Sequence, residues 1–222
     1  MPAETDTEIY EFRDWVFRYR SAQGMPAHLL LLFHGWTGDE NSMWYFARNI
    51  PVQTAILAPR APYPAPEGGY TWREISPGTW GYPSLDDLRP SAEAFLGFID
   101  GWGHSIGWDL DQFDLVGFSQ GAALSYVITI LHPKIVRSLT VLSGFMPDGA
   151  DAYLMPDILD GKAVFVAHGR QDDMVPVEKA RSSVGLLEKS GAQVTYCESD
   201  GGHKVSKECF GGMERFFKGR FG

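Results

Sequence analysis

The sequence predicts an α/β fold, in which a mostly parallel central sheet carries helices on both faces. Short apolar runs alternate along the chain with longer segments of helical period. The run at residues 29–33, Leu-Leu-Leu-Leu-Phe, has no polar position. A strand that is apolar on both sides is buried on both faces, as strands of parallel sheets are. The alternation of strands with helices therefore predicts parallel pairing and a covered sheet.

The first half of the chain provides edge strands, two buried strands and one helix. Residues 8–20 alternate aromatic and polar side chains, which indicates one or two strands at a sheet edge. Buried strands are expected at residues 29–33 and 55–58. A helical period over residues 88–102, with Pro90 in its first turn, predicts the first helix.

The second half continues the alternation of strands and helices. Strands are expected at residues 113–116, 136–142, 163–167 and 192–197, and helices at 122–131, 176–189 and 204–218. We find no internal repeat and no linker. A chain of 222 residues suits one α/β domain, so a single domain over residues 1–222 is expected.

Composition limits the classes of function. A formal net charge of -9 argues against nucleic acid as a partner, and solubility alone accounts for it. Cys197 and Cys209 are too few for a disulfide scaffold, so we interpret each as a small buried hydrophobe in a reducing compartment. The acidic start is not a signal peptide, and no apolar run would span a bilayer. A cytoplasmic location without stable membrane insertion is therefore predicted.

The sequence Gly117-Phe118-Ser119-Gln120-Gly121 is the most informative stretch of the chain. It follows an apolar strand and precedes a helical pattern, so Ser119 is predicted at the apex of a sharp strand-to-helix turn. Such a turn holds the hydroxyl clear of its neighbours and needs small residues two before and two after the serine. The helix that follows aims its N–H groups at a developing oxyanion. Ser119 is therefore the candidate nucleophile.

A serine nucleophile needs a base, and the base needs an orienting acid. On this kind of turn the chain order is serine, then acid, then histidine. His203, in a Gly-rich turn after the last strand, fits as the base, with Asp172 or Asp173 as the acid. His168 precedes both acids and fails as the base. His28 is interpreted as structural, and His104 and His132 lie near helix ends. His34 belongs to a Gly-containing turn with Trp36, whose N–H is a candidate oxyanion donor.

Four separated stretches together resemble the phospholipase/carboxylesterase family of α/β-hydrolases, which includes acyl-protein thioesterases. They are Leu32-Phe33-His34-Gly35 with residues 38–41, Gly117 to Gly121, His168-Gly169 with Asp172 and Val175-Pro176, and Gly202-His203. The resemblance spans roughly residues 27 to 217. It implies an α/β-hydrolase fold, Ser119 as nucleophile, Asp172 as acid and His203 as base. It also implies that the N–H groups of Trp36 and Gln120 form the oxyanion hole.

The loop at residues 59–83 is rich in Pro, Gly, Tyr and Trp and has no clear period. Loops of this length are usually functional or disordered, and the aromatic residues argue against disorder. We expect this loop to lie near the active site and to shape a substrate pocket. The expected substrate-binding residues are Trp72, Trp80, Phe145 and Met174.

The sequence thus predicts a serine hydrolase that cleaves carboxylic esters of small molecules through an acyl-enzyme. No zinc or nucleotide-binding motif is present, so no metal and no cofactor are expected. One alternative is a thioesterase that acts on S-acylated proteins or acyl thioesters. Another, from a different class, is a catalytically silent hydrolase fold that serves as a binding module. Either a monomer or a homodimer is compatible with the sequence.

Overall fold

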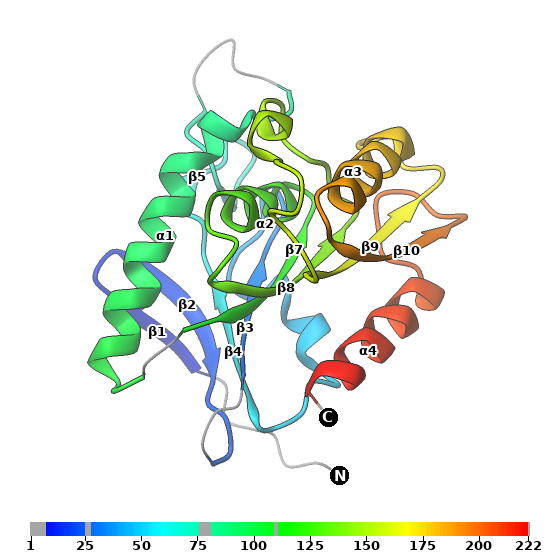
Figure 1. Cartoon of the computed structure of the whole chain (residues 1–222). Helices are drawn as coiled ribbons and strands as arrows, with labels where there is room; N and C mark the ends of the chain where they lie inside the picture. Colours follow the sequence, from blue (N-terminus) through cyan, green and yellow to red (C-terminus); the bar gives the residue numbers. More distant parts are fainter. Residues whose placement is uncertain (1–7, 25–27, 76–80, 109–110, 222) are drawn as a thin grey trace.

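A twisted sheet forms the centre of the molecule (Figure 1). The structure is a computed structural model, and it describes residues 8–24, 28–75, 81–108 and 111–221. Within these residues the sheet has eight strands in the order β1-β2-β4-β3-β7-β8-β9-β10. Their bounds are β1 Glu8–Phe12, β2 Trp15–Arg20, β3 His28–Phe33, β4 Thr54–Pro59, β7 Phe113–Phe118, β8 Val136–Leu142, β9 Ala163–Gly169 and β10 Gln193–Ser199.

Parallel pairing runs from β4 through β10, and only the edge hairpin departs from it. β1 pairs antiparallel with β2, and β2 pairs antiparallel with β4. All the neighbours from β4 onward are parallel. The predicted mostly parallel sheet with an aromatic edge is therefore confirmed. Because parallel strands end at the same edge, the loops after β3, β7, β9 and β10 come together there.

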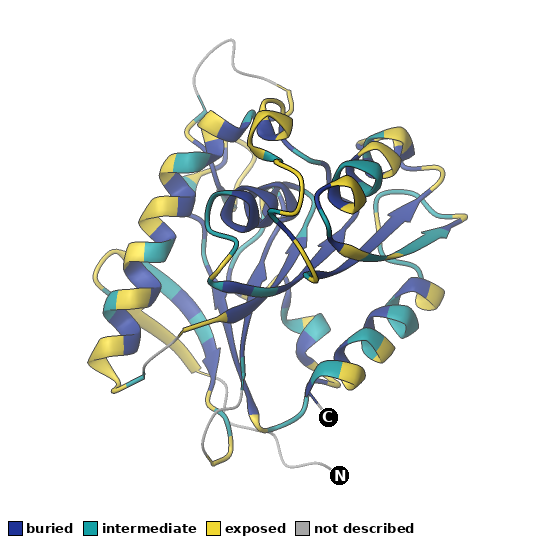
Figure 2. Ribbon diagram, in the orientation of Figure 1, coloured by how far each residue is buried: buried dark blue, intermediate teal, exposed yellow. Residues whose placement is uncertain are grey.

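Helices cover both faces of the sheet (Figure 1). α1 (Leu85–Ser105), α2 (Gln120–Leu131) and α3 (Val177–Lys189) pack on one face, and α4 (Lys207–Phe221) packs on the other together with the short helix η1 (Trp44–Ala47). A second short helix, η2, spans Ala150–Tyr153. Figure 2 shows the buried positions concentrated in the strands and on the inner sides of the helices. The predicted two-faced α/β architecture is confirmed.

The apolar run of β3 divides between two cores. Leu29, Leu31 and Phe33 join the core beneath α1, α2 and α3. Leu30 and Leu32 join the core beneath α4 and η1. Successive side chains of a strand point to opposite faces, so a strand between two cores must be apolar at every position. This is why the sequence shows a continuous run and not an alternation.

Two helices begin three residues away from their predicted starts, and capping explains both. α1 begins at Leu85, three residues earlier than expected, because Ser84 and Asp87 form a capping box. Pro90 consequently lies in the second turn of α1. α4 begins three residues later than expected, and the hydroxyl of Ser206 accepts a hydrogen bond from the N–H of Cys209 at 3.1 Å.

The loop at residues 59–83 contains a small hairpin of β5 (Tyr63–Pro64) and β6 (Tyr70–Thr71). It packs on the turn after β3: the N–H of Tyr70 donates to the carbonyl of Gly38 at 2.9 Å. A Cβ on Gly69 would lie 2.0 Å from the carbonyl oxygen of Thr37, so the backbones approach too closely for any other residue. The loop therefore lies beside the edge of the sheet where the site is expected. Trp80 lies outside the described residues.

The two cysteines form a disulfide, which corrects the prediction of two separate buried thiols. Cys197 in β10 and Cys209 in α4 have their Cα atoms 5.5 Å apart. They are 12 residues apart in sequence, and the connection folds back so that α4 packs on the face of the sheet that carries Cys197. The sequence argument considered only how many cysteines there are and not this docking. Because the two cysteines form a disulfide, they no longer indicate a reducing compartment.

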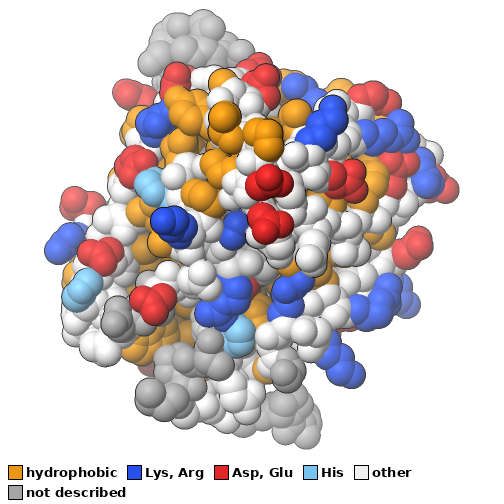
Figure 3. All heavy atoms as spheres, viewed as in Figure 1, with side chains coloured by type: hydrophobic (Ala, Val, Ile, Leu, Met, Phe, Trp, Pro, Cys, Tyr) orange, Lys and Arg blue, Asp and Glu red, His pale blue; other side chains and the backbone are white. Residues whose placement is uncertain are grey.

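No helix in the described part of the chain combines the length and the apolar character needed to cross a membrane. On the face of the molecule shown in Figure 3, acidic and basic side chains are interspersed. The net charge of -9 is thus not gathered into a single acidic patch on that face.

Candidate active site

Ser119 occupies a strained turn between β7 and α2. Its backbone has φ 52° and ψ -116°, a conformation that L-residues rarely adopt. A Cβ on Gly117 would lie 2.4 Å from the carbonyl oxygen of Gly121, and a Cβ on Gly121 would lie 2.3 Å from that of Phe33. Both positions therefore exclude any side chain. The predicted strand-turn-helix with small residues on both sides of the serine is confirmed.

Three side chains from separate loops meet at this turn. Nε2 of His203, in the loop after β10, lies 3.0 Å from Oγ of Ser119. Nδ1 of the same ring lies 2.8 Å from Oδ2 of Asp172, in the loop after β9. The structure thus brings together the three residues that the resemblance singled out. An ionised carboxylate only accepts hydrogen bonds, so Nδ1 carries the proton and Nε2 is left to accept one from the hydroxyl.

The loop after β9 fixes the orientation of Asp172. Its Oδ1 accepts hydrogen bonds from the N–H groups of Met174 and Val175 at 3.0 and 2.8 Å. The buried ring of His168 donates from Nε2 to the carbonyl of Val175 at 2.8 Å and lies behind the acid. Asp173 points into solvent. The sequence left the two aspartates open on position alone, and the fold turns Asp172 toward His203.

His34 holds the turn after β3 in place. Nδ1 donates to the carbonyl of Gly35 at 2.7 Å, and Nε2 accepts from the N–H of Ala61 at 3.0 Å. Burial lowers the pKa of His34 to about 4, so the ring is neutral and both bonds fit one tautomer. A Cβ on Gly38 would lie 2.7 Å from the ring. Sequence analysis placed His34 only in a Gly-containing turn beside Trp36, and the partner at Ala61 carries no sequence signal.

The side chain of Gln120 forms hydrogen bonds that sequence analysis did not predict. Its Oε1 accepts hydrogen bonds from the N–H of Trp72 at 3.0 Å and from the hydroxyl of Thr71 at 3.1 Å. The residue next to the nucleophile therefore anchors the loop at residues 59–83. Gln120 is buried, and a buried amide requires hydrogen-bond partners, but the sequence alone does not show this burial.

A cavity of about 290 Å³ opens at Ser119. Trp36 and Gln120, the expected oxyanion donors, line it together with the serine. Phe145 and Met174, two of the expected substrate-binding residues, also line it. Its remaining walls come largely from the loop at residues 59–83, through Glu67, Arg73, Gly81, Tyr82 and Pro83.

Trp72 does not line this cavity, and its predicted place as a pocket wall is wrong. Its side chain is completely buried, with its ring against Trp15 and Phe33. Its indole N–H donates to the carbonyl of His34 at 2.8 Å. A large ring with one polar atom is well accommodated in a core that offers an acceptor, so Trp72 supports the site from beneath.

Arg73 connects the loop at residues 59–83 to the start of α1. Its guanidinium lies 3.7 Å from the carboxylate of Asp87 and donates to the carbonyl of Gly81 at 2.9 Å. Among the described residues, no group of three or more His, Cys, Asp or Glu side chains is placed as a set of metal ligands.

The mostly parallel sheet and the strand-turn-helix at Ser119 are those of an α/β-hydrolase fold, and His203 and Asp172 lie in hydrogen-bond contact beside the serine. The chain belongs to the Phospholipase/Carboxylesterase family, whose model matches residues 18–219. This confirms the predicted family, fold and class of activity, the hydrolysis of carboxylic esters.

Similar proteins agree with this assignment. The acyl-protein thioesterase 1 of Kluyveromyces lactis is 29% identical over 195 residues, which cover 76% of this chain and 80% of that protein. A carboxylesterase structure from Mesorhizobium loti has a TM-score of 0.79 at 25% identity, and the match covers 96% of this chain and 99% of that one. A Bacillus cereus carboxylesterase, at 19% identity and a TM-score of 0.79, covers 91% of this chain and 93% of that one and shares the fold.

Proposed function

We propose that Ser119 attacks the carbonyl of a carboxylic ester and forms an acyl-enzyme. The observation that supports this most directly is the pair of contacts at His203, 3.0 Å to Ser119 and 2.8 Å to Asp172. Nε2 of His203 accepts the proton of the hydroxyl as its oxygen bonds to the carbonyl carbon. The same nitrogen then donates this proton to the departing alcohol. Water then attacks the acyl carbon and loses a proton to Nε2 of His203. His203 returns this proton to Oγ of Ser119 as the acid departs.

In this proposal the N–H groups of Trp36 and Gln120 bind the oxyanion. Gln120 lies in the first turn of α2, where backbone N–H groups have no acceptor within the helix. Both residues border the cavity that contains Ser119. Donors placed in advance stabilise the charge that develops on the carbonyl oxygen, because they need no reorganisation during the reaction.

We assign the acyl group to the 290 Å³ cavity, against Phe145 and Met174. Apolar surface beside the nucleophile favours burial of an acyl chain. Because this cavity is small, we expect it to bind short or medium acyl groups. A series of p-nitrophenyl esters of increasing chain length measures this preference.

The test of the proposed function is labelling of Ser119 by a fluorophosphonate probe, together with turnover of p-nitrophenyl esters. Ser119→Ala is expected to abolish both while leaving the fold intact, because a triad without its nucleophile retains only a small residual rate. Ser105→Ala, at an exposed position on α1, is the matched control and retains both. Absence of labelling in the wild type would favour the alternative of a silent binding module.

A thioesterase is the second candidate, because similar proteins carry the name acyl-protein thioesterase. The proposed chemistry accepts a thiol leaving group as readily as an alcohol, since His203 protonates either. Turnover of an S-acyl peptide compared with a p-nitrophenyl ester of the same acyl chain distinguishes the two activities.

The cytoplasmic location and the assembly state are further proposals. The cytoplasm keeps most thiols reduced, so the disulfide between Cys197 and Cys209 is an observation against this location. Alkylation of a fresh lysate before and after reduction measures their state. We propose either a monomer or a homodimer, and light scattering of the purified protein distinguishes them.

A further inference from the structure

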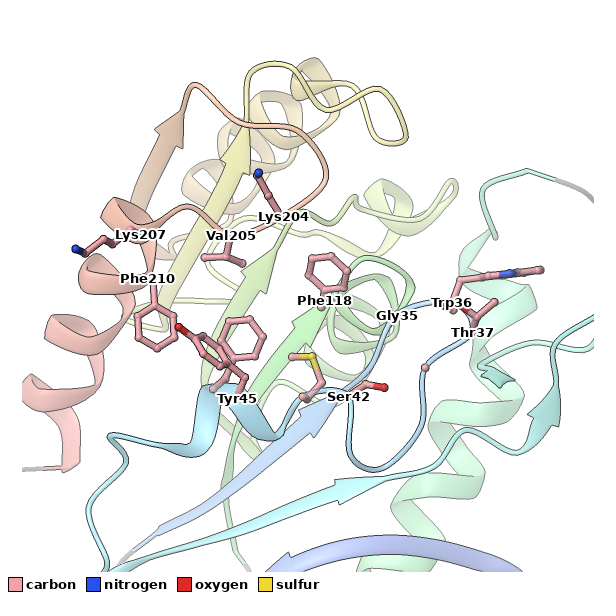
Figure 4. A pocket seen from close by; sticks show the side chains of 13 residues that line it. Gly35, Trp36, Thr37, Ser42, Tyr45, Phe118, Lys204, Val205, Lys207 and Phe210 are labelled. Carbon is pink, nitrogen blue, oxygen red and sulfur yellow. Dashed lines mark hydrogen bonds between the residues drawn. The ribbon is translucent and has the colours of Figure 1, made fainter. Parts of the chain in front are cut away.

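A second cavity, of about 860 Å³, lies beside the site, with Phe118 and Lys204 among its lining residues (Figure 4). Its walls come from the turn after β3, from η1, from the loop after β10 and from the start of α4. Trp36 borders both this cavity and the smaller one that contains Ser119. The chemistry proposed above uses only the smaller cavity, so the larger one has no role yet.

The larger cavity lies directly beside the reacting groups. Phe118, the residue before Ser119, is one wall, and its ring centroid is 5.1 Å from that of His203. Gly35 is another, and a Cβ on it would lie 3.2 Å from Cβ of Ser119. Lys204, the residue after His203, stands at the rim. Ser119 and His203 do not themselves line this cavity, but each is adjacent in sequence to a wall residue, Phe118 or Lys204.

The direction of proton transfer assigns this cavity to one half of the substrate. The departing oxygen or sulfur must receive its proton from Nε2 of His203, so the leaving group lies on the side of the histidine. We propose that the larger cavity binds the leaving group, and that this group has an aromatic or apolar body and an anionic substituent. This inference rests on the proposed ester hydrolysis.

The apolar body is suggested by the aromatic walls. Tyr45 and Phe46 of η1 pack against Phe210 of α4, with ring centroids 5.3 and 5.9 Å apart. Met43 and Val205 add aliphatic surface. Tyr45 remains 53% exposed, although the guanidinium of Arg48 lies over its ring at 4.6 Å from the centroid. An aromatic ligand would cover it and gain both apolar burial and ring contacts.

The anionic substituent is suggested by Lys204 and Lys207. Both ammonium groups extend outward from the rim, and the described residues that line the cavity include no acid (Figure 4). Neither lysine forms an ion pair within the described part of the chain. In a chain of net charge -9, two unpaired cations at the mouth of a cavity select for a carboxylate or phosphate there.

The position of this wall is fixed by covalent and hydrogen-bonded contacts. Cys209, next to Phe210, is joined to β10 through the disulfide with Cys197. Ser206 caps α4 between the two lysines. The aromatic and cationic elements thus stand on a segment with little freedom to move, which favours a defined ligand over a loose one.

The test compares acetyl esters that differ only in the charge of the leaving group. 4-Carboxyphenyl acetate and 3-(4-acetoxyphenyl)propanoate carry the anion at two distances from the reacting bond, and their methyl esters are neutral counterparts. The measured quantity is the ratio of kcat/KM for the anionic ester to that for its neutral counterpart. Comparing this ratio between variants cancels the intrinsic reactivity of each ester.

Lys204→Gln/Lys207→Gln is expected to lower the ratio for at least one ester pair by roughly three- to tenfold, as the loss of two partly exposed ion pairs would. Lys134→Gln/Lys218→Gln removes the same charge elsewhere on the surface and keeps the wild-type ratio. Raising the salt concentration should lower the wild-type ratio and leave that of the lysine double variant nearly constant. An unchanged ratio in the lysine double variant overturns the inference.

A second pair of esters, with the charge on the acyl group, tests which half of the substrate occupies the larger cavity. Monophenyl succinate carries its carboxylate on the acyl side, and phenyl butyrate is its neutral counterpart. The ratio for this pair should be the same in the wild type and in Lys204→Gln/Lys207→Gln. If it falls while the leaving-group ratio does not, the acyl group occupies the larger cavity and the assignment is reversed. If the wild type hydrolyses none of the esters, the proposed function itself has failed.

Discussion

The carboxylate of Asp172 and the ring of His203 are joined by a 2.8 Å contact between Oδ2 and Nδ1. The other carboxylate oxygen accepts two backbone N–H groups of its own loop, so the acid has no freedom to turn away. The neighbouring Asp173 points to solvent. Two chemically identical side chains, adjacent in sequence, are thereby placed in different environments.

Asp172→Asn is expected to lower kcat by about 10⁴-fold, because an amide at this position favours the wrong tautomer of His203. Asp173→Asn is the matched control and should keep the wild-type kcat, with a loss of at most about 1 kcal/mol in the free energy of unfolding. Steady-state kinetics and urea unfolding measure the two quantities. An inactive Asp173→Asn protein beside an active Asp172→Asn protein would contradict the assignment.

Trp72→Ala should lower the free energy of unfolding by about 3–5 kcal/mol, because it removes a completely buried ring from the core. Met174→Ala, at a position 64% exposed in the wall of the smaller cavity, should instead change the preference among p-nitrophenyl esters and barely affect stability. Thermal unfolding and the ester series together separate the two roles. A stable Trp72→Ala protein with an altered ester profile would restore Trp72 as a pocket wall.

The order of strands and helices was predictable because the packing leaves a direct mark on the sequence. β3 is apolar from Leu29 to Phe33 because it separates two cores, and residues 117 and 121 must be glycine because a Cβ there would lie within 2.5 Å of backbone atoms. The loop positions of Ser119, Asp172 and His203 follow from the chain order and the parallel sheet. These features depend on local pattern and connectivity.

The features that the sequence did not yield depend on contacts between distant segments. Nothing in the loop at residues 59–83 distinguishes an aromatic ring that enters the core, as Trp72 does, from one that borders a cavity, as Tyr82 does. The disulfide between Cys197 and Cys209 depends on how α4 docks on the sheet. The bond between Ala61 and His34 joins two turns whose proximity is set by the pairing of β3 and β4.

The disulfide closes a connection of 12 residues that carries His203, Lys204 and Lys207. Cys197→Ser/Cys209→Ser should lower the free energy of unfolding by about 3 kcal/mol, the loop-closure entropy expected for a connection of this length. Dithiothreitol should lower the melting temperature of the wild type to about that of the double serine variant. The double serine variant is the control, because its melting temperature should not respond to the reductant. Equal melting temperatures of the oxidised and reduced wild type would contradict a stabilising role.

The stability of the protein should fall in acid because of His34. Burial lowers the pKa of this ring in the folded protein to about 4, from an ordinary value of 6.5. Between these two pH values the unfolded chain binds a proton that the folded protein excludes, so protonation favours unfolding. The contribution of His34 is complete above pH 6.5 and is lost as the pH falls toward 4, by about 3 kcal/mol in total.

His34→Gln provides the control for this pH dependence, because an amide offers both a donor and an acceptor at the position and does not titrate. Urea unfolding of both proteins between pH 8 and pH 4.5 gives the free energy of unfolding at each pH. The wild type is expected to lose stability more steeply below about pH 6.5, whereas carboxyl groups elsewhere affect both proteins equally. The difference between the two curves should therefore shrink as the pH falls. Parallel curves across this range would mean that His34 is not held neutral by the fold.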